Sequence, residues 1–305
     1  MNKQGTLVAL LGPTASGKTS LSLDLAEWLQ TEIVSCDSRQ FFQELKIGAA
    51  PPSAEELQKI PHHFIQHLSI SSDYNAGRYE QDAIPVIEDV IARKGTAVLV
   101  GGSGMYARAI FHGFDDLPKA TPEIRDELIK EVNENGLENL QRELKKRDPE
   151  TYERIDLQNP QRMIRALEII RSTGRPYSEM RKGEPRKRTF GIVKLGLELD
   201  RAILYDRINQ RVDQMVKDGL IEEARELFPF RDHNALQTVG YRELFDYFQG
   251  LVSREEAIEK IKKNTRNFAK RQMTWFKREP GIQWFEPKDR EQIIEFIAKR
   301  LDDEN

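Results

Sequence analysis

The sequence contains one cysteine, Cys36, among its 305 residues. A single thiol cannot form an internal disulfide, so we expect a reducing compartment and interpret the protein as cytoplasmic. The same scarcity excludes a cysteine-based zinc finger, which needs several ligands at close spacing.

Long apolar runs are also missing. The longest, 7–11 and 97–100, are far shorter than the roughly 20 residues that cross a bilayer, so no membrane association is predicted. Residues 1–5 lack the residue order of a signal peptide. A hydrophobic fraction of 38% and a charged fraction of 32% are typical of a globular protein.

The formal net charge is −3, which by itself does not favour nucleic-acid binding. The distribution of charge does, because residues 260–278 hold eight Lys or Arg and no acid. Residues 171–188 hold seven basic residues against two acids. Such clusters indicate a nucleic-acid surface, although each run could also be a solvated helix face.

Short apolar runs alternate with helical patterns along much of the chain. The predicted strands are 6–11, 33–36, 97–100 and 191–197, and the predicted helices include 19–29, 76–93, a helical region over 200–228, and 254–276. This order predicts an α/β fold with a parallel sheet.

Residues 118–188 lack strand-like runs and are charged and helical in pattern. Pro122 and Pro160 stand where the first turn of a helix tolerates proline, and the second helix carries an apolar stripe. We therefore predict a helical insertion at 118–188 within a P-loop core formed by 1–117 and 189–305.

The turn after the first strand fits G-x-x-x-x-G-K-[ST] without a mismatch and leads into a helix. Its glycines let backbone N–H groups converge on phosphate oxygens, and a lysine adds a full positive charge. The hydroxyl of Thr19 could bind Mg²⁺. The predicted diphosphate-binding residues are Gly12, Thr14, Ala15, Ser16, Gly17, Lys18 and Thr19.

The strand 97–100 ends in Gly-Gly-Ser-Gly, without the acid that an NTPase usually places there to hold its metal. We therefore do not expect a hydrolytic NTPase. A cradle of this kind recognises a diphosphate, and a diphosphate can be a leaving group. Ser103 offers a hydroxyl near the same edge, although most such glycine runs are turns.

Asp37 follows the second strand. Ligands of open α/β sheets gather beyond the carboxyl ends of the strands, so Asp37 should face the same crevice as the glycine-rich turn. There it could accept a proton from a nucleophile. A helix N-cap or an indirect partner of magnesium is the alternative. His62, His63 and His67 could suggest a metal site, but packing is the favoured interpretation.

Taken in order, these motifs resemble the tRNA dimethylallyltransferases, also called tRNA isopentenyltransferases. The resemblance spans nearly the whole chain and rests on GPTASGKT at 12–19, DSRQ at 37–40, PHHF at 61–64, GGSGMY at 101–106, NPQRMIRALEI at 159–169, TVGYREL at 238–244 and KRQMTWFKR at 270–278.

The resemblance implies that dimethylallyl diphosphate and Mg²⁺ bind at the P-loop. The sequence gives no oligomeric signal, and we expect a monomer because the tRNA itself is the large partner. It implies transfer to the exocyclic amino group of the adenine next to the 3′ side of the anticodon, flipped into the site. Catalysis would fall to Asp37 as the base, with Ser103 and Lys18.

Contacts with the tRNA anticodon stem-loop are implied for Asp37, Ser38, Arg39, Gln40, Ser103, Arg125, Gln161, Arg162, Met163, Ile164, Arg165, Gln237, Thr238, Val239, Gly240, Tyr241 and Arg242. Basic residues of 260–278 would bind the RNA backbone. Core packing is favoured over base stacking for Trp275 and Phe276.

The chain departs from the family at three places. It has Gly-Ala-Ala-Pro at 48–51 where Gly-Thr-Ala-Lys-Pro is common, phenylalanine at 41 and 42 near a usual tyrosine, and serine at 103 for threonine. Three other functions stay open: prenylation of free adenine nucleotides, a small-molecule P-loop kinase, and a non-catalytic RNA-binding module.

Overall fold

The computed structural model describes residues 5–115, 117–118, 121–181 and 183–303. The chain divides into two compact units. Unit 1 comprises Met1–Phe111 and Lys187–Asn305, and unit 2 comprises His112–Arg186. Each unit has its own hydrophobic core.

Unit 1 is built on one six-stranded sheet in which every paired strand is parallel. The strands are β1 (Thr6–Leu11), β2 (Ile33–Ser35), β3 (His62–His63), β4 (Thr96–Gly101), β5 (Gly191–Leu197) and β6 (Ile282–Phe285). Their order across the sheet is β3-β2-β4-β1-β5-β6, which confirms the predicted parallel α/β fold.

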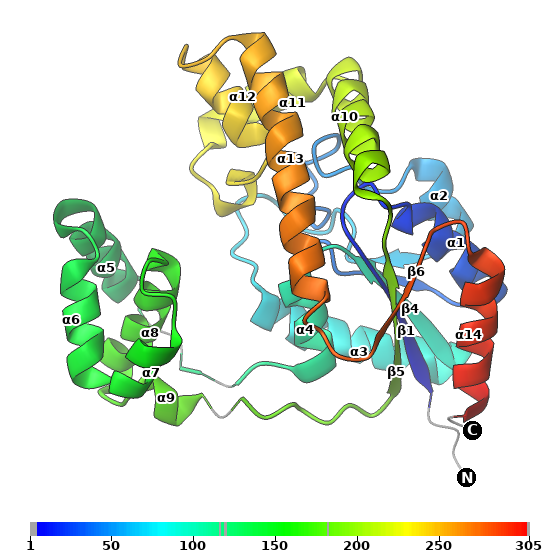
Figure 1. The fold of residues 1–305 in the computed structure, drawn as a ribbon, viewed down its shortest axis with the longest axis horizontal. Coiled ribbons are helices and arrows are strands. Elements are labelled where there is room, and N and C mark those ends of the chain that lie inside the picture. The colour runs from blue at the N-terminus through cyan, green and yellow to red at the C-terminus, as the bar shows by residue number, and fades with distance from the viewer. Residues whose placement is uncertain (1–4, 116, 119–120, 182, 304–305) are drawn as a thin grey trace. The chain divides into compact units, whose positions relative to one another are not determined.

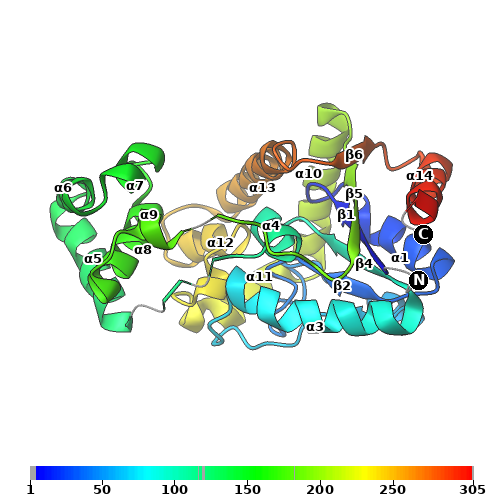
Figure 2. The ribbon, with the colours of Figure 1, turned by 90° about the horizontal axis from the view of Figure 1, so that it is seen from below.

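Helices cover both faces of the sheet (Figures 1 and 2). Alternate residues of β1 enter opposite cores, because successive side chains of a strand point to opposite faces. Val8 and Leu10 pack with α1 (Lys18–Trp28) and α14 (Arg290–Asp303). Leu7 and Ala9 belong to the core formed with α3 (Ala76–Lys94) and α4 (Gly104–His112). This burial on both faces explains the continuous apolar run of β1.

The C-terminal half of unit 1 adds a group of helices around the carboxyl ends of the strands. They are α10 (Arg201–Lys217), α11 (Leu220–Leu227), α12 (Tyr241–Phe248) and α13 (Arg254–Phe276), with the 3₁₀ turns η1 (Phe228–Phe230) and η2 (Asn234–Leu236). The helical region predicted over 200–228 is interrupted before α11 at Gly219, whose φ of 103° a helix cannot continue.

Sequence patterns did not predict every element. The short strands β3 and β6, the helix α2 (Ala54–Lys59) and the helix α14 were not anticipated. β6 pairs with β5 through Lys194↔Ile282 to Leu197↔Phe285, and this contact between distant segments leaves little local signal.

Unit 2 is helical, as its pattern indicated, and consists of α5 (Pro122–Asn135), α6 (Glu138–Arg147), α7 (Pro149–Arg154), α8 (Pro160–Thr173) and α9 (Tyr177–Met180). Its core includes Leu128, Leu144, Met163 and Leu167. The side chain of Asn159 caps α8 by accepting from the N–H of Arg162. None of the helices in the described ranges is both long and apolar enough to pass through a membrane.

Candidate active site

The carboxyl ends of β1 and β4 form the centre of the candidate site. These strands are neighbours, with Leu11 opposite Gly101, but the helices that follow them cover opposite faces of the sheet. Such a reversal opens a crevice at the edge of the sheet, where ligands of doubly wound folds bind. β2 lies on the other side of β4, with Ser35 opposite Val100, and so delivers Asp37 to the same edge.

The glycine-rich turn after β1 has the backbone of a phosphate cradle. Gly12, Ala15 and Gly17 have φ values of 153°, 62° and 91°. A Cβ on Gly12 would approach the Leu197 carbonyl oxygen to 3.0 Å, so glycine is needed there for space as well as for conformation. Lys18 folds over the turn, and its Nζ donates to the Pro13 carbonyl at 2.7 Å.

The cradle carries positive charge and a hydroxyl group without a hydrogen-bond partner among the described residues. Burial lowers the pKa of Lys18 to about 8, with nearby Asp37 opposing the shift and Arg211 adding to it. The Ser16 hydroxyl is buried and has no hydrogen-bond partner among the described residues. A bound diphosphate would stabilise the charged lysine and could accept from the serine.

Two arginines of α10 that no sequence motif indicated complete the cradle. Arg207 and Arg211 border a hollow together with Ala15 to Thr19. Burial lowers the pKa of Arg211 from its ordinary value, as expected for a cation that awaits an anion. Their i, i+4 spacing places both on one helix face, but nothing local indicated that this face meets the P-loop.

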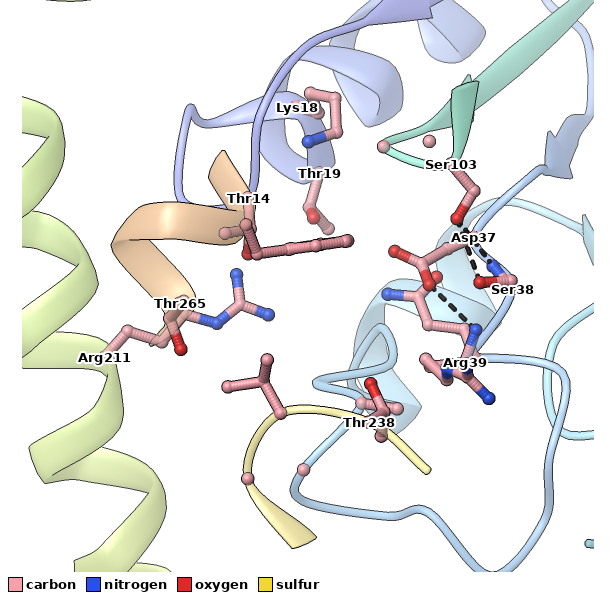
Figure 3. Close-up of a pocket in the computed structure, with 18 of the residues that line it drawn as sticks. Thr14, Lys18, Thr19, Asp37, Ser38, Arg39, Ser103, Arg211, Thr238 and Thr265 are labelled. Atoms are coloured by element: carbon pink, nitrogen blue, oxygen red, sulfur yellow. Dashed lines mark hydrogen bonds between the residues drawn. The ribbon is translucent and has the colours of Figure 1, made fainter. Parts of the chain in front are cut away.

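Asp37 lies across a cavity of about 210 Å³ from this cradle (Figure 3). Its Oδ1 accepts from the Arg39 N–H at 3.0 Å, which orients the carboxylate. The Ser103 hydroxyl accepts from the Ser38 N–H at 3.1 Å and donates to the Ser38 hydroxyl at 3.1 Å. Ser103 therefore holds the turn that carries Asp37.

The lining of the same cavity includes apolar side chains. Ile208, Val212 and Met215 of α10, Val239, and Phe268 of α13 contribute to it together with polar groups that include Thr14, Thr19 and Asp37. An apolar chain attached to a diphosphate matches this mixed lining. The carboxylate remains free to accept a proton from a group that enters beside it.

The loop at 46–50 is held at the cavity by Glu223 of α11. Its carboxylate accepts from the N–H groups of Lys46 at 2.8 Å, Ile47 at 2.7 Å and Gly48 at 2.9 Å. It also accepts from the Tyr241 hydroxyl at 2.6 Å. Because Gly48 and Ala49 line the cavity, Glu223 shapes the site without facing it.

The residues with implied tRNA contacts fall into separate groups. Ser38, Arg39, Gln40, Thr238, Val239 and Gly240 line the cavity together with Asp37 and Ser103. Gln237 and Arg242 are exposed nearby in sequence. In unit 2, Gln161, Arg162 and Arg165 are exposed on α8, and Arg125 and Arg165 donate to Glu168.

Three of the implied contacts need correction. Met163 is 0% and Ile164 is 6% exposed in the core of unit 2, and Tyr241 is 1% exposed in unit 1. Their side chains pack inside the protein and are not available to RNA. The Thr14 N–H donates to Gln272 at 2.9 Å, and Thr14 also lines the cavity, so its contact with a diphosphate stays a prediction.

The histidines have structural partners. His63 Nε2 lies 2.7 Å from a carboxylate oxygen of Glu32, and His62 Nδ1 lies 2.7 Å from the Ile60 carbonyl oxygen. The described residues contain no group of three or more side chains suited to a metal ion. Phe276 is fully buried and Trp275 packs against the same core, as predicted.

Comparison with known proteins places this geometry in a family. The model of the family described as IPP transferase matches residues 40–279. The chain is 50% identical over 296 residues to a tRNA dimethylallyltransferase of Christiangramia forsetii, covering 97% of this chain and 98% of that protein. It is 47% identical to tRNA dimethylallyltransferase 1 of Bacteroides fragilis, covering 97% and 98%.

Solved structures agree. The full-length tRNA isopentenylpyrophosphate transferase of Bacillus halodurans matches with a TM-score of 0.73 and 40% identity, over 99% of this chain and 98% of that one. A eukaryotic dimethylallyltransferase described as acting on tRNA matches with a TM-score of 0.75 and 27% identity, over 89% of this chain and 69% of that one.

Proposed function

We propose, because the chain belongs to the IPP transferase family of tRNA dimethylallyltransferases, that it transfers a dimethylallyl group to tRNA. The donor is dimethylallyl diphosphate, and the acceptor is the exocyclic amino nitrogen of the adenine 3′-adjacent to the anticodon. The observation that carries this proposal is the phosphate cradle facing the Asp37 carboxylate across one cavity.

The cradle binds the leaving group. Positive charge is presented where the departing diphosphate gains negative charge. It comes from Lys18, Arg211 and the backbone N–H groups of the loop. The apolar wall formed by residues such as Val212 and Met215 receives the five-carbon chain. Closing this part of the cavity with substrate excludes water, which would otherwise compete as a nucleophile.

Asp37 serves the acceptor. The amino nitrogen attacks the first carbon of the dimethylallyl group, and the bond from that carbon to the diphosphate oxygen breaks. Diphosphate leaves with the bonding electron pair, and the nitrogen gives its surplus proton to Asp37. The adenine amino group is a weak nucleophile, so much of the acceleration comes from holding nitrogen and carbon in line.

Mg²⁺ fits this site as a partner of the diphosphate. Thr19 offers a hydroxyl in the cavity, while the described residues provide no all-protein metal cage. Mg²⁺ usually keeps several waters and binds through substrate phosphates with one or two protein oxygens, which suits this lining. When bound, it would neutralise charge on the leaving diphosphate.

We assign the tRNA anticodon stem-loop to two surfaces. In unit 1, Arg39, Gln40 and the segment 237–242 bind the target base and its neighbours, and basic side chains of α13 bind phosphates. In unit 2, taken as the tRNA-binding insertion, exposed Arg162 and Arg165 contribute further phosphate contacts. The enzyme acts as a monomer in this proposal.

One assay tests the function against its alternatives. The purified protein is incubated with labelled dimethylallyl diphosphate, Mg²⁺ and a tRNA that carries adenine after the anticodon. Label in the tRNA is expected, whereas label solely in added adenine nucleotide would establish the free-nucleotide enzyme. ATP-dependent phosphorylation of a small molecule would identify a kinase instead.

A variant links the assay to the site. Asp37→Ala should lower the transfer rate by about 10²- to 10⁴-fold, the usual range for a lost general base, because Asp37 is the only carboxylate among the described residues that line the cavity. Its affinity for tRNA should change by less than about threefold. Full activity in this variant would remove Asp37 as the base.

A further inference from the structure

We propose that Gln272 is a positioning residue that locks the P-loop to the Gly101–Gly104 turn and thereby sets the geometry of the diphosphate seat. The kinetic part of this proposal rests on the proposed function, whereas the binding part does not. Gln272 belongs to α13 and is 7% exposed.

Both ends of the Gln272 amide are used. Its Oε1 accepts from the Thr14 N–H at 2.9 Å, and its Nε2 donates to the Gly102 carbonyl oxygen at 2.8 Å. The partners determine which atom is oxygen and which is nitrogen, since a backbone N–H needs an acceptor and a carbonyl needs a donor. One side chain therefore satisfies two backbone groups from different turns.

These contacts lie beyond the last β1–β4 pair, where the sheet no longer joins the turn after β1 to the turn after β4. The pairing of β1 with β4 ends at Leu11↔Gly101, and the helices that follow diverge to opposite faces. Gln272 bonds to Thr14 and Gly102, just beyond the last pair. It thus continues the connection between β1 and β4 beyond the end of the ladder.

The fit around Gln272 is tight. A Cβ on Gly102 would lie 2.4 Å from Gln272 Nε2, so the glycine makes room for the amide. The glycines on either side face protein too, because a Cβ on Gly101 would lie 2.5 Å from Cys36 Sγ and one on Gly104 would meet the Trp275 ring. The glycines of this turn therefore serve close packing of protein groups.

A chain of hydrogen bonds connects the P-loop to the residue next to the proposed base. Gln272 joins the P-loop to the Gly101–Gly104 turn, and Ser103 of that turn hydrogen-bonds Ser38, which is adjacent to Asp37. Reacting groups lose rate steeply when misplaced by about 1 Å, so a fixed distance between cradle and carboxylate has direct value for catalysis. Gln272 lines the same cavity, but both ends of its amide are engaged by backbone groups, so it acts on this distance through the two turns.

The first experiment replaces Gln272 by methionine, which has a similar shape but makes neither bond. Binding of inorganic diphosphate with Mg²⁺ is measured by calorimetry, and binding of an anticodon stem-loop RNA in parallel. We expect the Kd for diphosphate to rise about tenfold, as for the loss of about one net hydrogen bond, and the RNA Kd to stay within about twofold. The exposed Gln292→Met on α14 is the matched control.

In steady-state assays, Gln272→Met should raise KM for dimethylallyl diphosphate and lower kcat, because the phosphate cradle and Asp37 are no longer held at a fixed separation. Unchanged diphosphate binding and kinetics would overturn the proposal, even if thermal stability fell. If the wild-type protein transfers no prenyl group, the proposed function fails. The diphosphate-binding measurement then still tests whether Gln272 positions the P-loop.

A second variant gives a readout that a purely structural role would not move. In Gln272→Glu, an ionised carboxylate can accept from Thr14 but repels the Gly102 carbonyl, whereas a protonated carboxyl restores both bonds. Burial raises the pKa of such a group. Relative to wild type, diphosphate affinity of this variant should recover as the pH falls from about 8 to about 5.5.

The diphosphate affinity of Gln272→Met, divided by that of wild type, should stay constant across this pH range. This variant is therefore the control for general pH effects. A Gln272→Glu ratio that is equally constant would contradict the two-bond arrangement. If Gln272→Met does not fold, the pH profile of Gln272→Glu relative to wild type still decides the question by itself.

Discussion

Replacing Glu223 by glutamine tests whether a carboxylate outside the cavity controls its wall. Glu223 accepts four hydrogen bonds, three from consecutive N–H groups at 46–48 and one from the Tyr241 hydroxyl. Glutamine retains one acceptor oxygen and has an NH₂ group in place of the other. That NH₂ group is a donor and would face the N–H or O–H donors that the carboxylate accepts from. At least two bonds to a charged acceptor are lost.

The magnitude follows from these contacts. Hydrogen bonds to charged groups contribute roughly 1.5–3 kcal/mol each, and partial exposure of Glu223 reduces this value. We expect the free energy of unfolding to fall by about 2–4 kcal/mol. Tyr241→Phe removes one of the bonds and should cost about 1–2 kcal/mol. The exposed neighbour substitution Glu222→Gln should stay within about 0.5 kcal/mol of wild type.

The loop also carries the effect to the site. Gly48 and Ala49 line the cavity, and the Ala50 carbonyl accepts from Gln40 Nε2 at 2.9 Å. A released loop should therefore lower kcat/KM for prenyl transfer by about tenfold, under conditions where denaturant titration shows the variant fully folded. If Glu223→Gln matches Glu222→Gln in both stability and kcat/KM, the reasoning is refuted.

Three further predictions follow from charges and burial. Because the Lys18 ammonium has a pKa of about 8, it is charged below that pH and loses its proton above it. Diphosphate affinity should fall as the pH rises from about 7 to about 9, and calorimetry in buffers of different ionisation enthalpy should detect proton uptake; pH-independent binding would contradict this. Arg211→Met should raise the Kd for inorganic diphosphate about 10- to 100-fold, whereas exposed Lys217→Met on the same helix should not. Met163→Ala should lower stability by about 2–4 kcal/mol in chemical denaturation, because it opens a void in the core of unit 2, while Gln161→Ala should be nearly neutral; equal effects would argue against the burial of Met163.

The local parts of the site could be predicted from sequence. The P-loop needs glycines at fixed positions after an apolar strand, so its chemistry is recorded within eight consecutive residues. The position of Asp37 at the end of β2 follows from a strand pattern and from the rule that ligands gather at carboxyl edges. Helical spacing likewise predicted the apolar stripe on α8, and the structure leaves Arg162 and Arg165 exposed outside it.

Other expectations failed where packing overrides pattern. Met163, Ile164 and Tyr241 lie within motifs assigned to RNA contact, but a motif also contains the residues that pack its contacting neighbours into place. The strand β3 spans two residues and gave no periodic signal. A strand this short is specified by its partner β2, through the pairs Ile33↔His62 and Val34↔His63.

The sequence by itself thus determined the phosphate cradle, the carboxylate at a strand end and the order of the four predicted strands along the chain, because each depends on residues close together in the chain. Tertiary structure alone decided that Arg207 and Arg211 meet the cradle, that Glu223 holds the loop at 46–48, and that Gln272 bridges Thr14 and Gly102. Gln272 lies 258 residues from Thr14 and 170 from Gly102. Periodicity and motif spacing describe neighbours along the chain, and contacts at such separations arise when helices pack around the completed sheet.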